Sequence, residues 1–263
     1  MDDRIFFFGT CSGTEPMPGM HHVSFAIRHS DRLYWFDAGE CCSFTAHNMG
    51  VDLQSIRAIF ISHPHMDHIG GLGDLLWNIR KLDGIGHRVA GKTIDLYMPD
   101  RGETWGALLP LLRQTESGFR IKFTIDEKRI GDGVIFDEDG VKVTALHNSH
   151  LPALDDGSFR SYSFRIDAGG KSVVFSGDTG SYGEIAPLIT GADVLLAETG
   201  HHTPAEVCEE LNGMGAKPHR LMFIHHGLCM IHHQEESIAA AKSIYDGHID
   251  VLKDGDNLPL EEL

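Results

Sequence analysis

The segment FISHPHMDH, residues 60–68, places three histidines and one aspartate within six positions, directly after an apolar run. Pro64 favours an extended backbone at His63, and in an extended segment residues two apart point to the same side. His63 and His65 can therefore converge on one metal ion. Asp67 and His68 lie where the chain turns into a helix and can face a second ion. Imidazole and carboxylate groups suit zinc, iron and manganese, and this spacing favours a metal site over a loop of exposed histidines.

Further candidate ligands follow apolar runs elsewhere in the chain. VKVTALHNSH ends in His147 and His150, and VVFSGDTGS carries Asp178. LMFIHHG carries His225 and His226. An isolated aspartate at the end of a strand is usually a turn former, and an isolated histidine is usually structural. Together with the first segment, however, they form a series that predicts a site for two metal ions.

These side chains need a framework, and the sequence predicts a single mixed α/β domain over residues 1–263, with sheets covered by helices. Short runs rich in Val, Ile, Phe and Tyr and bounded by Gly, Asp and Ser are typical of β-strands. The runs are RIFFF, VSFAI, LYWF, AIFI, IDLYM, FRIKFTI, VKVTAL, YSFRI, SVVFS, DVLLA and LMFI.

Helical patterns separate these strands, over residues 67–81, 101–117 and 234–246 and from Thr203 onward. Asp100 suits the cap position of the second helix. In TPAEVCEEL, Thr203 suits the N-cap position, Pro204 suits the first turn, and Glu206 can close a capping box.

Composition narrows the possible partners. The net charge of −16 repels polyanions, and no cluster of Lys and Arg offsets it, so the composition disfavours nucleic acid and favours a small substrate. No apolar run approaches the roughly 20 residues that span a bilayer, and the start MDDRIFFFGTC lacks the basic region of a secretory signal. Five cysteines without framework spacing suggest a reduced, cytoplasmic protein.

Several segments together resemble the metallo-β-lactamase fold superfamily, and within it the ribonuclease Z group and its small phosphodiesterase relatives. HPHMDHIGGL matches the hallmark of the superfamily, and SGDT, residues 176–179, matches a second block. FFFGTCSGTEPMPGMHHVSFAI is similar to the opening strand and loop of the group, and LLAETGHHTPAEV to a later block. WFDAGECC resembles the Asp-Cys-Gly-Glu-Gly segment, with Ala38 in place of Cys and Cys41 in place of Gly.

The resemblance implies a four-layer αββα sandwich with two metals in a groove along one edge of the sheets. Zinc is the expected metal, with manganese or iron as alternatives. One ion would be bound by His63, His65 and His150, the other by Asp67, His68 and His225, with Asp178 bridging them and Asp37 orienting a histidine ligand. Counting from the preceding strands favours His150 over His147 and His225 over His226.

The resemblance also implies a general acid for the leaving group. His201 matches the histidine of the family, with His202 as the alternative, and Glu198 is placed to orient it; Glu198 could otherwise be a surface acid at a strand end. Asp67 would hold the attacking water. His21 and His22 are candidates for the mouth of the site, although a solvated loop is the simpler interpretation of both.

For function, this pattern favours a phosphodiesterase that acts on a small or cyclic phosphodiester. The ribonuclease Z group holds tRNA with a Gly/Pro-rich basic arm, and residues 69–149 contain no such excursion. A tRNA 3′-processing endonuclease is the first alternative, a lactonase or thioesterase the next, and a ligand-binding regulatory protein on the same fold the last. Dimers are common among the relatives, so a homodimer is a further expectation.

Overall fold

The computed structural model describes residues 2–86, 88–89, 91–100, 102–114, 121–215 and 217–263. In these residues the strands form two seven-stranded sheets. The first has the order β14 (Asn257–Pro259), β1 (Arg4–Gly9), β2 (Ser24–His29), β3 (Arg32–Phe36), β4 (Ile56–Phe60), β5 (Thr93–Met98) and β6 (Thr124–Arg129). The second has the order β13 (His248–Val251), β12 (Arg220–His226), β11 (Val194–Thr199), β10 (Lys171–Phe175), β9 (Tyr162–Ala168), β8 (Val141–His147) and β7 (Gly133–Glu138).

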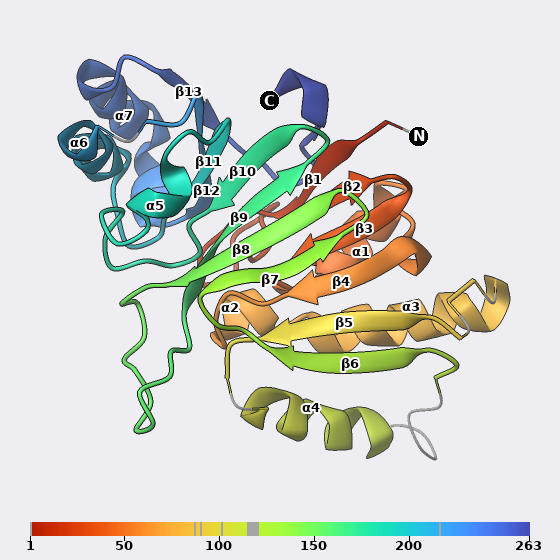
Figure 1. The fold of residues 1–263 in the computed structure, drawn as a ribbon. Helices are drawn as coiled ribbons and strands as arrows, with labels where there is room; N and C mark the ends of the chain where they lie inside the picture. The colour runs from red at the N-terminus through yellow and green to blue at the C-terminus, as the bar shows by residue number, and fades with distance from the viewer. Residues whose placement is uncertain (1, 87, 90, 101, 115–120, 216) are drawn as a thin grey trace.

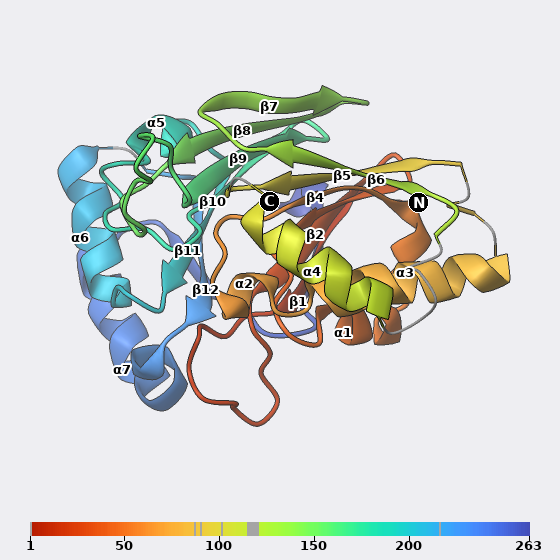
Figure 2. The same ribbon diagram turned by 90° about the horizontal axis from the view of Figure 1, so that it is seen from below.

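Helices cover the outer faces of both sheets (Figures 1 and 2). On the first sheet lie α1 (Cys42–Asn48), α3 (Leu72–Gly86) and α4 (Glu103–Gln114), and the short α2 (Met66–Ile69) follows β4. On the second lie α5 (Ala186–Ile189), α6 (Pro204–Met214) and α7 (Leu228–Ile244). Short 3-10 turns stand at Leu53–Ser55 and Leu260–Glu262.

Three apolar clusters hold these layers together. On the inner face of the first sheet, the ring of Phe36 stacks on those of Phe25 and Phe60, with centroid distances of 5.0 and 4.9 Å. Phe175 of the second sheet meets Phe25 edge-on, with the centroids 5.1 Å apart. A second cluster lies between the first sheet and its helices, and a third between the second sheet and its own. Burial of this apolar surface holds each layer against the next. The two sheets with helices on their outer faces confirm the expected αββα sandwich.

The topology gathers the ends of many strands at one edge. Strands β3, β4 and β5 run parallel to one another in the first sheet, as do β10, β11 and β12 in the second. Strand β8 has the same direction as β10, because both pair antiparallel with β9. The carboxyl ends of these strands therefore meet at one edge of the sandwich, where loops commonly carry functional side chains.

Most of the expected elements are present. The run FRIKFTI is the exception, because the strand there is β6, displaced toward the C-terminus, and residues 119 and 120 lie outside the described residues. The apolar runs do not predict strands β7, β13 and β14. These strands lie at the edges of the sheets, where fewer side chains are buried and the apolar pattern is weaker.

The helix expected over 67–81 is two helices, α2 and α3, separated at Gly70 and Gly71. A side chain at Gly71 would stand 2.1 Å from the carbonyl oxygen of Gly39, so only glycine permits this close approach of the two segments.

The predicted helix caps at Thr203 and Asp100 are confirmed. The side chain of Thr203 accepts a hydrogen bond from the amide of Glu206 and forms a full capping box at α6. At α4, Asp100 accepts from the amide of Thr104 at 3.0 Å, and residues 115–117 of the expected helix lie outside the described residues. The last helix, α7, runs from Leu228 to Ile244 but is interrupted by a non-helical backbone at His233, so its second part begins where the helix over 234–246 is expected. In the described part of the chain, no helix is both long and apolar enough to cross a membrane. The extent of a single domain over 1–263 stays a prediction.

Candidate metal centre

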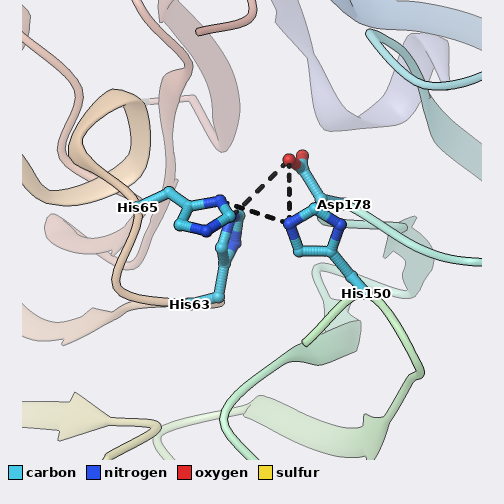
Figure 3. Close-up of side chains that lie close together, drawn as sticks. All are labelled: His63, His65, His150 and Asp178. Atoms are coloured by element: carbon cyan, nitrogen blue, oxygen red, sulfur yellow. Dashed lines mark hydrogen bonds and ion pairs between the residues drawn. The ribbon is translucent and has the colours of Figure 1, made fainter. Parts of the chain in front are cut away.

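The first group of candidate ligands is His63, His65, His150 and Asp178, whose ligand atoms all lie within 4.8 Å of one another. Figure 3 shows the three imidazoles and the carboxylate converging from three separate segments. Nδ1 of His65 lies 3.0 Å from Nε2 of His63 and 3.2 Å from Nε2 of His150. One oxygen of Asp178 lies 3.6 Å from His63 Nε2 and 3.7 Å from His150 Nε2.

The second group is Asp67, His68, Asp178 and His225, again within 4.8 Å. His225 Nε2 lies 3.1 Å from an oxygen of Asp67 and 3.2 Å from Oδ1 of Asp178. His68 Nε2 lies 3.2 Å from the same Asp178 oxygen. Asp178 therefore belongs to both groups and presents one oxygen to each, as a carboxylate shared by two metal ions would.

Local backbone geometry explains how His225 reaches this group. The pairing of β11 with β12 shifts register between Glu198 and Thr199, and His225 has a left-handed backbone with φ 54°. Such a conformation is uncommon outside glycine and occurs often at functional sites. It turns His225 toward the candidate ligands, whereas His226 points elsewhere and its Nε2–H donates to the carbonyl of Leu252 at 2.8 Å.

Asp37 lies behind His68 and fixes its orientation. This fully buried carboxylate accepts hydrogen bonds from the amide of Ser62 at 2.6 Å, the hydroxyl of Ser62 at 2.7 Å and Nδ1 of His68 at 2.7 Å. When Nδ1–H of His68 donates to Asp37 and the ring is neutral, its Nε2 lone pair is available to a metal ion in the second group. The hydroxyl of Ser62 also lies 3.1 Å from Nδ1 of His63. Partners of this kind orient the histidine ligands of metal sites.

The charges of the site fit cations. Burial alone would lower the pKa of His225, but the carboxylates of Asp178 and Asp67 outweigh it and raise the pKa to about 9. Burial raises the pKa of Asp178, and His225 and His68 more than offset this and hold it well below its usual range. Oδ1 of Asp178 and Nδ1 of His225 are buried without a hydrogen-bond partner among the described residues. Buried polar groups are normally hydrogen-bonded, so a carboxylate oxygen that lies between two imidazole nitrogens without a hydrogen bond is consistent with a site for metal ions.

A comparison with known proteins decides the family. The model of the family described as "Beta-lactamase superfamily domain" matches residues 36–240, more than half of the chain. The chain belongs to this superfamily. The predicted family is thereby confirmed.

Relatives within the superfamily include the ribonuclease Z of Mycobacterium avium, which is 28% identical over 193 residues, covering 69% of this chain and 65% of that protein. Among solved structures, the metallo-β-lactamase fold protein YhfI from Bacillus subtilis has a TM-score of 0.75 at 17% identity, over 98% of this chain and 99% of that one. The short form of human tRNase Z has a TM-score of 0.73 at 17% identity, with the same coverage. These structures show a common fold. Because a curated relative is a ribonuclease Z, the comparisons do not support the expected exclusion of nucleic acid.

His201 and His202 are the candidates for the general acid, and both lie beside the two groups. His201 Nδ1 lies 3.2 Å from Oε1 of Glu198 and 3.7 Å from Asp178, and the ring is about half exposed. The hydrogen bond that Nδ1–H of His201 donates to Glu198 raises the pKa of His201, against the opposing effect of burial. His202 is turned away, since its Nε2–H donates to the carbonyl of Thr179 at 2.9 Å. Glu198 is fully buried and is not a surface acid.

Three other expected residues, His21, His22 and His147, belong to neither group. His147 pairs with Asp132 at 2.7 Å and stacks on Phe159 at 3.6 Å, so the structure brings His150 and not His147 to the first group. His21 pairs with Asp254 at 2.9 Å, at the base of the loop that follows β1. His22 is half-buried, and its carbonyl oxygen packs against Gly9. The roles of His21 and His22 at the mouth stay predictions.

The sequence did not reveal several close contacts around the site. A side chain at Gly13 would stand 3.0 Å from a carboxylate oxygen of Asp67, and one at Gly200 would stand 2.6 Å from Nδ1 of His225. Both glycines therefore allow backbone to pack directly on candidate ligands. Ser62 precedes His63 and could have been singled out as a partner for its ring, but Gly13 and Gly200 carry no such signal.

Proposed function

We propose that this chain is a dinuclear metal-dependent phosphodiesterase whose substrate is a small or cyclic phosphodiester. The observation that carries this proposal is the pair of four-residue groups that share Asp178. The first metal would be held by His63, His65 and His150, and the second by Asp67, His68 and His225. Zinc suits this ligand set best, and manganese or iron are the alternatives.

Two bound metal ions would act as Lewis acids and activate water near neutral pH. The carboxylates of Asp67 and Asp178 face each other across His225, whose Nε2 lies 3.1 Å from one and 3.2 Å from the other. They can orient a water molecule for attack on phosphorus and accept its hydrogen bonds. His201 is about half exposed beside them and can donate a proton to the leaving oxygen, while Glu198 holds its Nδ1.

Charge and chain organisation support a small substrate. The net charge of −16 disfavours a long polyanion, and the described residues between His68 and β8 form α3, β5, α4, β6 and β7. The second candidate is tRNA 3′-processing, because the chain is 28% identical to a ribonuclease Z over 69% of its length.

A substrate panel with the zinc- and manganese-loaded protein tests this function. Bis(4-nitrophenyl) phosphate and cyclic nucleotides should be hydrolysed, and precursor tRNA should be cleaved with a lower kcat/KM. Preferred cleavage of precursor tRNA would establish the second candidate, and preferred hydrolysis of a lactone or thioester would establish an acyl hydrolase. No hydrolysis, together with a metal content near zero after purification without chelator, would favour a ligand-binding protein.

Single variants test the roles of the site residues. Asp67→Ala should abolish turnover and weaken the binding of one metal more than the other, because Asp67 belongs to only one group. His201→Ala should lower the rate by about 100-fold for a poor leaving group and much less for nitrophenolate, which needs no proton. Equal losses on both substrates would remove His201 from the role of general acid.

A further inference from the structure

Tyr182 is a fully buried residue of the loop that follows Asp178, and its hydroxyl donates a hydrogen bond to the carbonyl of Glu198 at 2.9 Å. Burial raises the pKa of Tyr182 well above its ordinary value, so the hydroxyl is a donor near neutral pH. No resemblance or motif singled out this residue.

The amide and carbonyl of Glu198 need side-chain partners because the pairing of β11 with β10 ends before this residue. The pairing of β10 with β11 ends at Phe175 and Leu196, two residues before Glu198. Beyond that point, the amide of Glu198 donates to the hydroxyl of Ser176 at 3.0 Å, and its carbonyl accepts from Tyr182. The side chains of Ser176 and Tyr182 thus provide the hydrogen bonds that β10 does not provide beyond Phe175. Buried peptide groups require such partners.

The carboxylate of Glu198 in turn fixes the next turn of chain. Oε2 accepts hydrogen bonds from the amides of Gly200 and His201, both at 2.8 Å, and Oε1 lies 3.2 Å from Nδ1 of His201. The orientation of the His201 ring therefore depends on the backbone position of Glu198.

Tyr182 is itself held from the opposite side. Its amide donates to Glu210 of α6 at 2.8 Å, and its ring meets that of His202 at 5.4 Å, nearly edge-on. The residue connects three parts of the molecule: the loop after Asp178, helix α6 and the segment from Glu198 to His202.

We propose that Tyr182 is a positioning residue, which holds Glu198 so that His201 points at the leaving oxygen of the substrate. This inference rests on the proposed function, in which His201 protonates that oxygen. In this proposal the hydroxyl of Tyr182 supports the hydrolysis of substrates with poor leaving groups only through its hydrogen bond to Glu198.

Tyr182→Phe removes one oxygen atom and keeps the buried ring. For a diester with a poor leaving group, kcat should fall about tenfold, the effect of one lost hydrogen bond, with KM and zinc content unchanged. For a nitrophenyl ester, kcat should change less than about twofold. The control is Tyr245→Phe: Tyr245 is buried in the same apolar cluster, and its hydroxyl donates a long hydrogen bond to the carbonyl of Pro218 at 3.5 Å.

Hydrogen exchange provides a readout that is independent of turnover. The amides of Gly200 and His201 should exchange faster in Tyr182→Phe than in wild type or Tyr245→Phe, because their acceptor is less firmly held. If Tyr182→Phe does not fold, Ser176→Ala frees the other peptide group of Glu198 and should give the same signature.

Equal loss on both esters with unchanged exchange would overturn the positioning role. A wild-type protein without phosphodiesterase activity would instead overturn the proposed function, and the exchange measurement would then decide the positioning of Glu198 alone.

Discussion

Replacement of Asp37 by Asn tests whether the buried network behind His68 serves metal binding. Asp37 has a left-handed backbone with φ 51°, a conformation that asparagine adopts more readily than most residues. The substitution therefore preserves backbone and volume and changes only the charge and one acceptor. One oxygen of Asp37 accepts from both the Ser62 hydroxyl and His68 Nδ1, so an amide nitrogen at this position would face the N–H of His68.

The expected magnitude follows from these contacts. If the amide nitrogen faces His68, the ring must rotate or change tautomer to avoid two opposed donors, and its Nε2 no longer presents a lone pair to the second group. If the amide flips, its nitrogen opposes the amide N–H of Ser62 instead, and the neutral oxygen binds His68 more weakly than the carboxylate does. Loss of a partner that orients a ligand typically weakens metal binding by about 10–100-fold. At roughly 1.4 kcal/mol for each factor of ten, this corresponds to about 1.4–2.8 kcal/mol.

Competition of the protein with a chromogenic zinc chelator measures this change. Asp95→Asn is a matched control, because Asp95 is also buried in the first sheet but pairs with Arg57 at 3.0 Å and Lys128 at 2.8 Å. Asp37→Asn should lower zinc affinity, and Asp95→Asn should leave it unchanged while lowering stability. Wild-type zinc affinity in Asp37→Asn would refute the argument that Asp37 orients a metal ligand.

Three further predictions concern stability. Cys41 has a left-handed backbone with φ 61°, so Cys41→Gly should raise the free energy of unfolding by about 0.5–1 kcal/mol in urea melts, whereas Cys41→Ala should bring no gain. Thr203→Ala removes the N-cap of α6 and should lower the same free energy by about 1 kcal/mol, with Thr203→Ser close to wild type. Removal of metal by a chelator should lower Tm, and zinc at 100 times its Kd should restore about 2.7 kcal/mol; an unchanged Tm would argue against a metal site in the folded protein.

Local patterns accounted for most of the framework. Strands in the middle of each sheet, such as β4 and β11, are buried on both faces and therefore stand out as apolar runs. Edge strands such as β13 and β14 have half-exposed residues, and their pairing depends on neighbours distant in the chain. The same limit applies to α2 and α3, which are separated because Gly71 packs against Gly39, a contact invisible in a helical pattern.

The sequence by itself determined the candidate ligands, because residue type and spacing near strand ends are local properties. His63, His65, Asp67 and His68 fall within six positions, and their spacing alone suggests a metal site. Which of the more distant histidines join them was decided only by the tertiary structure. The left-handed turn at His225 and the pairing of His147 with Asp132 select one histidine from each pair. The burial of Tyr182 against Glu198 likewise depends on where β10 and β11 stop pairing. Such contacts join segments far apart in the chain, and only the packed sheets bring them together.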